Sequence, residues 1–161
     1  MKINKETMVG IIMGSKSDWE IMKNCCDIFK SFGIKFDVRV ISAHRTPRRL
    51  EKFVKQAEKG NYEVIIAAAG GAAHLAGVTA SLTTIPVLGV PMETKKIKGL
   101  DSLLSMAQMP KGVPVGCLAI DGAFNAGILA ASIIGNFDTK VKSNLEKWRR
   151  LQTQSIKKKP K

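Results

Sequence analysis

Five short runs of apolar residues occur along the sequence, and a segment with helical periodicity follows each of them. The runs lie at residues 9–13, 36–40, 64–69, 86–90 and 115–120. Their length and apolar content are typical of strands buried in a parallel sheet. Because helices separate the strands, the pattern predicts a central parallel sheet of about five strands with helices on both faces. The predicted fold class is a three-layer α/β sandwich of flavodoxin or Rossmann type.

The helices are predicted from their caps and their apolar faces. Ser17 and Glu20 have the spacing of a capping box, and the apolar face that follows continues as far as Gly33. A second helix is predicted after Thr46, which can cap it, with Pro47 in its first turn. The same patterns predict further helices at residues 72–81, 100–106, 124–134 and 139–153.

The length of 161 residues fits one domain with a sizeable core. We expect an α/β core over residues 8–138, a C-terminal helix over 139–153 and a disordered basic tail over 154–161. No uncharged apolar run approaches the roughly 20 residues of a membrane-spanning helix, so no membrane partner is expected. The polar N-terminus lacks the apolar core of a secretory signal, and Cys25, Cys26 and Cys117 lack disulfide-framework or zinc-site spacing. A cytoplasmic protein with reduced thiols is predicted.

The net charge of +13 is concentrated at the C-terminal end. Residues 140–161 hold nine Lys and Arg residues against the single acid Glu146, which leaves +5 for the rest of the chain. A basic run at a chain end is usually a solvated, frayed segment. Nucleic acid is therefore not expected as the main partner, although a non-catalytic nucleotide- or RNA-binding module of flavodoxin type stays open as an alternative.

Both histidines of the chain directly follow predicted strands. In an open parallel sheet the ligand crevice lies beyond the carboxyl ends of the strands, so His44 and His74 are expected at the same edge. Imidazole accepts and donates protons near neutral pH. His44 is the main candidate for a proton carrier, and His74 is a second candidate whose simpler role would be capping or packing.

The first strand is followed by a polar loop that can bind an anion. Ser15 and Ser17 offer hydroxyls beside a helix N-terminus, and Arg45 adds a cation after the second strand. Asp18 would repel a phosphate, so it suits sugar hydroxyls. Gly70 and Gly71 would allow a flat ring to approach the backbone closely.

Several common chemistries lack their motifs in this sequence. The P-loop, the Gly-x-Gly-x-x-Gly fingerprint, the Gly-x-Ser-x-Gly elbow and metal-ligand spacing are all absent. What remains is a phosphorylated small molecule that carries a ribose and a ring, placed beside a histidine able to move a proton.

Six motifs in this order resemble one enzyme family. They are Met-Gly-Ser-Lys-Ser-Asp (13–18), Ser-Ala-His-Arg-Thr-Pro (42–47), Ala-Gly-Gly-Ala-Ala-His-Leu (69–75), Pro-Val-Leu-Gly-Val-Pro (86–91), Ser-Leu-Leu-Ser-Met-Ala-Gln-Met-Pro (102–110) and Gly-Val-Pro-Val-Gly (112–116). Over about residues 8–150 the chain resembles the class I N5-carboxyaminoimidazole ribonucleotide mutases, in the AIR carboxylase family of purine biosynthesis. The resemblance implies carboxylate transfer from N5 to ring carbon C4 through CO₂ release and recapture, without metal, biotin, ATP or another cofactor.

The resemblance also implies roles for individual residues. His44 becomes the general acid and base, and the substrate-binding set becomes Ser15, Ser17, Asp18, Ser42, Ala43, Arg45, Gly70, Gly71, His74 and Leu75. The family forms octamers in which the C-terminal helix reaches over a neighbouring subunit. The apolar stripe Val141, Leu145, Trp148 and Leu151 is therefore expected to bury against another subunit. Direct carboxylation of aminoimidazole ribonucleotide by CO₂ is the alternative within the family.

Overall fold

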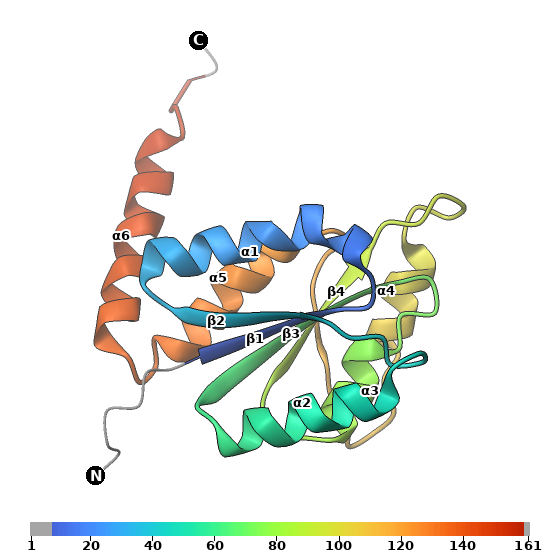
Figure 1. The fold of residues 1–161 in the computed structure, drawn as a ribbon. Coiled ribbons are helices and arrows are strands. Elements are labelled where there is room, and N and C mark those ends of the chain that lie inside the picture. Colours follow the sequence, from blue (N-terminus) through green and yellow to red (C-terminus); the bar gives the residue numbers. More distant parts are fainter. Residues whose placement is uncertain (1–7, 160–161) are drawn as a thin grey trace.

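The computed structural model describes residues 8–159, which form a parallel sheet of five strands with helices on both faces (Figure 1). The strand order is β2-β1-β3-β4-β5, and every neighbouring pair is parallel. The predicted three-layer α/β class is therefore confirmed. The strands are β1 (Met8–Met13), β2 (Lys35–Val40), β3 (Tyr62–Gly70), β4 (Val87–Met92) and β5 (Gly116–Cys117).

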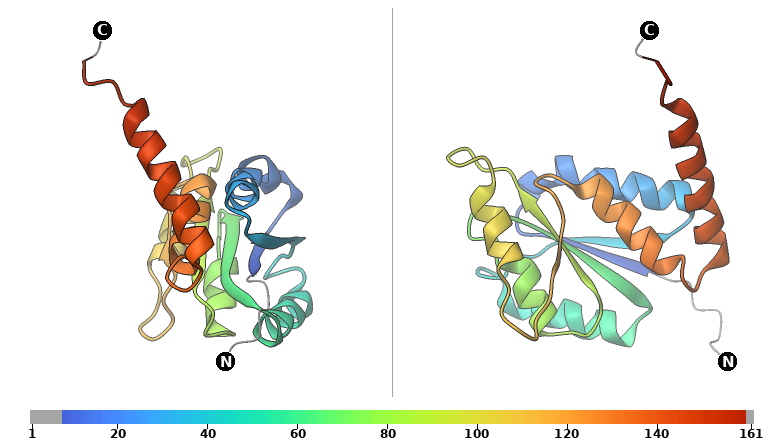
Figure 2. Two further views of the ribbon diagram at one scale, coloured as in Figure 1. Left: turned by 90° about the vertical axis from the view of Figure 1, so that its left-hand side faces the viewer. Right: turned by 180° about the vertical axis from the view of Figure 1, so that it is seen from behind.

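The helices divide between the two faces of the sheet. They are η1 (Lys16–Asp18), α1 (Trp19–Phe32), α2 (Pro47–Lys59), α3 (Leu75–Ser81), α4 (Leu100–Ala107), α5 (Ala123–Ile134) and α6 (Thr139–Ser155). Figures 1 and 2 show α1 and α5 on one face and α2 and α3 on the other. Across residues 8–159, none of the helices has both the length and the apolar character needed to span a bilayer.

The sheet carries one apolar core on each face, because successive strand residues point to opposite sides. Ile11 and Ile66 belong to the cluster beneath α1 and α5, whereas Ile12 and Ile65 belong to the cluster beneath α2 and α3. All four side chains are fully buried. With both faces covered, ligands have access to the sheet at its strand ends.

The predicted capping box of the first helix was placed two residues too late. Ser15, not Ser17, is the capping residue: its hydroxyl accepts the Ser17 amide and the Asp18 carboxylate accepts the Ser15 amide. These bonds form the 3-10 turn η1, and α1 follows at Trp19. Glu20 is an exposed partner of Lys23 instead of a cap. The polar side chains of this loop are thus drawn together before the helix begins.

Strand β5 is shorter than the predicted run at residues 115–120. Beyond Cys117 the chain stays beside β4, where the Leu118 amide donates to the Gly89 carbonyl (2.9 Å) and the Asp121 amide to the Pro91 carbonyl (2.8 Å). Gly89 and Pro91 therefore face β5, and Pro91 lacks the N–H that a continued ladder would need. The regular pairing ends there, and the chain leaves as a loop at the sheet edge.

Helix α6 packs on the core of its own chain along its first half, which corrects the expectation for its whole apolar stripe. Val141 and Leu145 are buried in the α1 and α5 core, and Trp148 packs against that core with its ring centroid 5.9 Å from that of Phe124. Leu151 alone of the stripe is mostly exposed, at 55%. Figure 2 shows the C-terminal half of α6 projecting from the body.

The C-terminal boundaries also differ from the prediction. Helix α6 ends at Ser155 instead of residue 153, so the first two residues of the expected tail are helical. Residues 160–161 of the tail, and the N-terminal residues 1–7 used to predict the compartment, lie outside the described residues.

Candidate active site

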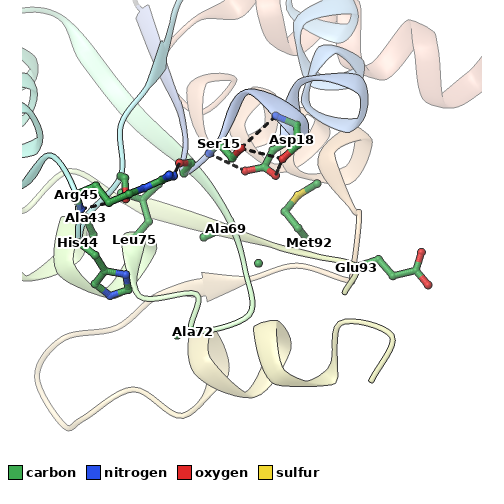
Figure 3. A pocket seen from close by; sticks show the side chains of 14 residues that line it. Ser15, Asp18, Ala43, His44, Arg45, Ala69, Ala72, Leu75, Met92 and Glu93 are labelled. Atoms are coloured by element: carbon green, nitrogen blue, oxygen red, sulfur yellow. Dashed lines mark hydrogen bonds between the residues drawn. The ribbon is translucent and has the colours of Figure 1, made fainter. Parts of the chain in front are cut away.

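A cleft of about 420 Å³ lies at the carboxyl ends of β1 to β4 (Figure 3). Nine of the residues predicted from sequence line it: Ser15, Ser17, Asp18, Ser42, Ala43, His44, Arg45, Gly70 and Leu75. Five lining residues were missed: Gly14, Ala69, Ala72, Met92 and Glu93. The predicted residues Gly71 and His74 are not in the lining and instead support it through hydrogen bonds described below.

The loop after β1 forms the most strongly hydrogen-bonded part of the cleft. The Ser17 hydroxyl lies 2.9 Å from the Ser15 hydroxyl and 3.2 Å from the Asp18 carboxylate, and the Ser15 amide lies 3.1 Å from that carboxylate. Burial raises the pKa of Asp18 against the opposing effect of these bonds, and the nearby Asp121 charge adds to the rise. A buried carboxylate of this kind suits neutral donors such as sugar hydroxyls and opposes a second anion.

The loop after β2 is closed by Thr46, although not in the predicted way. The Thr46 hydroxyl donates to the Ser42 carbonyl (2.9 Å) and accepts the Ser42 amide (3.0 Å), and it makes no cap bond to α2. Pro47 does begin the helix, as predicted. The resulting tight loop presents the side chains of His44 and Arg45 toward the cleft (Figure 3).

Arg45 connects the loops after β1 and β2. Its guanidinium donates to the Gly14 carbonyl (3.1 Å) and to the Ser42 hydroxyl (3.3 Å). A guanidinium has five N–H donors, so donors remain for an anion in the cleft. The bonds hold the cation at the end of the cleft that is formed by Gly14, Ser42 and His44.

The two histidines contact each other directly. His44 Nε2 lies 2.8 Å from His74 Nδ1, and the rings meet edge to face with centroids 4.9 Å apart. One of the two nitrogens must carry the shared proton, so the tautomers of the two rings are linked. His74 stands at the N-cap position of α3 but makes no side-chain cap bond, so its ring is available to orient His44.

The loop after β3 is fastened to α4. Gly71 has a positive φ of 70°, and its amide donates to the hydroxyl of Ser102 (2.9 Å), which in turn donates to the Met92 carbonyl (2.7 Å). Ser102 is fully buried. The Gly71 amide is therefore occupied within the protein, and a role for Gly71 in substrate binding stays a prediction.

Met92 and Glu93 were missed because β4 is longer than predicted. The predicted strand covered residues 86–90 and stopped before Pro91. The strand in fact includes Pro91 and carries Met92 and Glu93 to the cleft edge. Within residues 8–159, the structure places no three His, Cys, Asp or Glu side chains where they could hold a metal ion.

Comparison with known proteins gives a family. The AIR carboxylase family model matches residues 8–155. The N5-carboxyaminoimidazole ribonucleotide mutase of Brucella melitensis is 51% identical over 154 residues, covering 94% of this chain and 95% of that protein. The proteins of the same name from Vibrio cholerae and Escherichia coli are 53% and 48% identical, and each alignment covers at least 92% of both chains.

Solved structures agree on the fold. The crystal structure of Treponema denticola PurE is 25% identical with a TM-score of 0.86, and that of a PurE2 variant from the same organism is 24% identical with a TM-score of 0.87. Each alignment covers 94% of both chains. The resemblance inferred from the six motifs is confirmed over almost the whole described length, and the chain belongs to the AIR carboxylase family.

Proposed function

We propose that this protein is an N5-carboxyaminoimidazole ribonucleotide mutase of purine biosynthesis. The observation that carries this proposal is about 50% identity, over more than nine-tenths of both chains, to curated proteins of that name. The cleft agrees with it, because a candidate proton carrier and a fixed cation line the same cavity of about 420 Å³.

The proposed reaction needs no nucleophile from the protein. The N5–carboxylate bond breaks to release CO₂, and N5 gains a proton. Carbon C4 of the electron-rich ring then attacks the CO₂ and loses its own proton, so the overall change is an isomerisation. The protein must hold CO₂ next to C4 and supply one group that both donates and accepts a proton.

His44 is the group proposed for both proton transfers. It lines the cleft, and its Nε2 is held by His74 at 2.8 Å, which fixes the ring orientation and leaves its other nitrogen for the substrate. In this reaction His44 gives a proton to N5 and then receives the proton from C4. His74 is proposed to orient His44 from outside the lining.

The remaining side chains suggest how the ribonucleotide is oriented. Arg45, whose guanidinium donates to the Ser42 hydroxyl, is proposed to bind the phosphate together with Ser15, Ser17 and Ser42, which all line the cleft. The buried Asp18 is proposed to bind ribose hydroxyls. The apolar and glycine positions Ala43, Gly70 and Leu75 leave room for the ring.

Direct carboxylation of aminoimidazole ribonucleotide is the second candidate, since the matching family model carries the description AIR carboxylase. An isotope experiment separates the two reactions. The purified protein is given N5-carboxyaminoimidazole ribonucleotide labelled with ¹³C in the carboxylate, in buffer with unlabelled bicarbonate. A mutase retains the label in its product, whereas a direct carboxylase takes carbon from the pool and also turns over aminoimidazole ribonucleotide. Binding without turnover, weakened steeply by salt, would instead favour the non-catalytic module.

We propose that the protein acts as a single domain and assembles as an octamer. Support comes from large apolar side chains that remain exposed, among them Leu100 and Leu104 on α4 and Leu151 on α6. A cytoplasmic location is also proposed, because Cys25, Cys26 and Cys117 are free thiols. Sedimentation of the purified protein tests the assembly, and fractionation of cells tests the location.

A further inference from the structure

Residues 118–122, between β5 and α5, lie beside the end of β4. The contact is made by Asp121, whose amide donates to the Pro91 carbonyl (2.8 Å) and whose carboxylate accepts the Glu93 amide (2.9 Å). One residue thus binds the chain on both sides of Met92. This side chain comes from a loop that supplies no residue to the cleft lining.

The backbone of Asp121 has the left-handed conformation, with φ at 56°. Most residues avoid this region, and aspartate and asparagine are among the few side chains that enter it with some frequency. The conformation lets the Asp121 amide and carboxylate bind β4 while its carbonyl accepts the amide of Ala123 (2.9 Å), at the start of α5. The turn is therefore shaped around these bonds.

Met92 and Glu93 form one side of the cleft, and they are held from two directions. On the α4 side, the Ser102 hydroxyl donates to the Met92 carbonyl, and the Thr94 hydroxyl donates to the carboxylate of Asp101 (2.8 Å). On the opposite side, Asp121 holds the Glu93 amide. Figure 3 shows Glu93 at the far end of the cleft from His44. Within residues 8–159 the Glu93 side chain makes no hydrogen bond or ion pair of its own.

We propose that Asp121 is a positioning residue that fixes Met92 and Glu93 in place for substrate binding. The inference rests on the proposed mutase function, because it assigns this side of the cleft to the ribonucleotide. Asp121 does not touch the reacting atoms. Its loss is expected to weaken substrate binding while the proton transfers at His44 continue.

Two substitutions separate the side-chain bond from the backbone conformation. Asp121→Gly keeps access to the left-handed region and deletes the carboxylate acceptor. Asp121→Asn keeps both that access and an oxygen acceptor. We expect KM to rise about tenfold in Asp121→Gly with kcat within about twofold of the unchanged protein, since one hydrogen bond to a charged acceptor is lost. Asp121→Asn is expected to restore KM to within about threefold of the unchanged protein.

Hydrogen exchange measures the contact without any substrate. The Glu93 amide should be protected in the unchanged protein and in Asp121→Asn, and it should exchange at least about tenfold faster in Asp121→Gly. Asp138→Gly is the matched control. It also deletes a carboxylate that accepts backbone amides, those of Lys140 and Val141, but at the start of α6 and away from the cleft. It should lower stability and leave KM unchanged.

The outcomes distinguish this inference from the proposed function. An unchanged KM in Asp121→Gly, in a preparation with normal mutase activity, overturns the positioning role. The positioning role is also overturned if the Glu93 amide of the unchanged protein exchanges as fast as amides in an open loop. This measurement does not depend on whether Asp121→Gly folds. Absence of mutase activity in the unchanged protein overturns the proposed function instead, while the exchange data still report on the contact.

Discussion

The cleft and helix α6 lie at opposite ends of the sheet and are held by different forces (Figure 1). The cleft consists of polar loops joined by hydrogen bonds between residues far apart in sequence, such as Arg45 with Gly14 and Gly71 with Ser102. Helix α6 is held chiefly by apolar side chains, with Val141 and Leu145 buried in the core. Hydrogen bonds of this kind fix direction, whereas burial of apolar area supplies most of the stability.

This difference leads to an expectation about variants. Changes in the cleft should alter binding and turnover with little effect on folding. Changes in the first half of α6 should lower the fraction of folded protein. Activity should then fall only in proportion to that fraction. Variants of the cleft and of α6 test how far this separation holds.

The largest effect is expected from truncation after Asp138, which removes α6 and the tail. Because Val141 and Leu145 leave the core, the free energy of unfolding should fall by about 3–6 kcal/mol, at about 1.5–3 kcal/mol for each buried side chain. Truncation after Ser155 removes mainly exposed residues and should change the free energy of unfolding by less than about 0.5 kcal/mol. Thermal unfolding and light scattering on both truncations measure this. Unchanged stability and assembly in the shorter chain would show that α6 is dispensable.

Replacement of His44 with Asn should have the largest effect on chemistry. Turnover is expected to fall by about 10²- to 10⁴-fold, since the variant cannot carry the proton, while substrate affinity stays within a fewfold. The unfolding temperature should remain unchanged, because the side chain is exposed. His74→Asn, which removes only the supporting ring, should lose less turnover. Near-normal turnover in His44→Asn would reject the assignment of the proton carrier.

Arg45→Ala should weaken substrate binding by about 10- to 100-fold, because a charge-assisted contact to phosphate contributes about 1.5–3 kcal/mol. Its kcat at saturating substrate should change much less. Arg48→Ala is the control, since Arg48 is an exposed arginine on α2 that does not line the cleft. Equal KM values for the two variants would mean that the phosphate is bound elsewhere.

The smallest effect concerns the pH dependence of stability through Asp18. Burial raises the pKa of this carboxyl in the folded protein. The folded state therefore binds the proton more tightly than the unfolded state, and this contribution to stability is lost as pH rises through the folded pKa. Asp18→Asn cannot ionise, so it should gain stability relative to the unchanged protein as pH rises above the ordinary aspartate pKa of 3.8. Urea unfolding at several pH values measures the difference, with Asp27→Asn, the same substitution at an exposed carboxylate on α1, as the control.

Local patterns in the sequence predicted most of the cleft-forming loops. A buried parallel strand has a recognisable composition, and the topology brings the carboxyl ends of such strands to one edge. This was enough to place Ser15, Asp18, His44 and Arg45 around one cavity. It failed at Met92 and Glu93, because the predicted strand over residues 86–90 stops short of them, whereas β4 continues through Pro91 to Met92.

The strand and helix alternation, the sheet class and the shared edge of the two histidines follow from the sequence alone, since they depend on side-chain periodicity and chain connectivity. The tertiary structure decided the 2.8 Å contact between His44 and His74, the hydrogen bond from the Glu93 amide to Asp121 and the packing of α6 on the core of its own chain. The two contacts join residues that are 30 and 28 positions apart in the sequence. Helix α6 packs on one apolar surface among several that were available to it. Periodicity reports which face of an element is apolar. Which partner meets that face depends on how every other element packs.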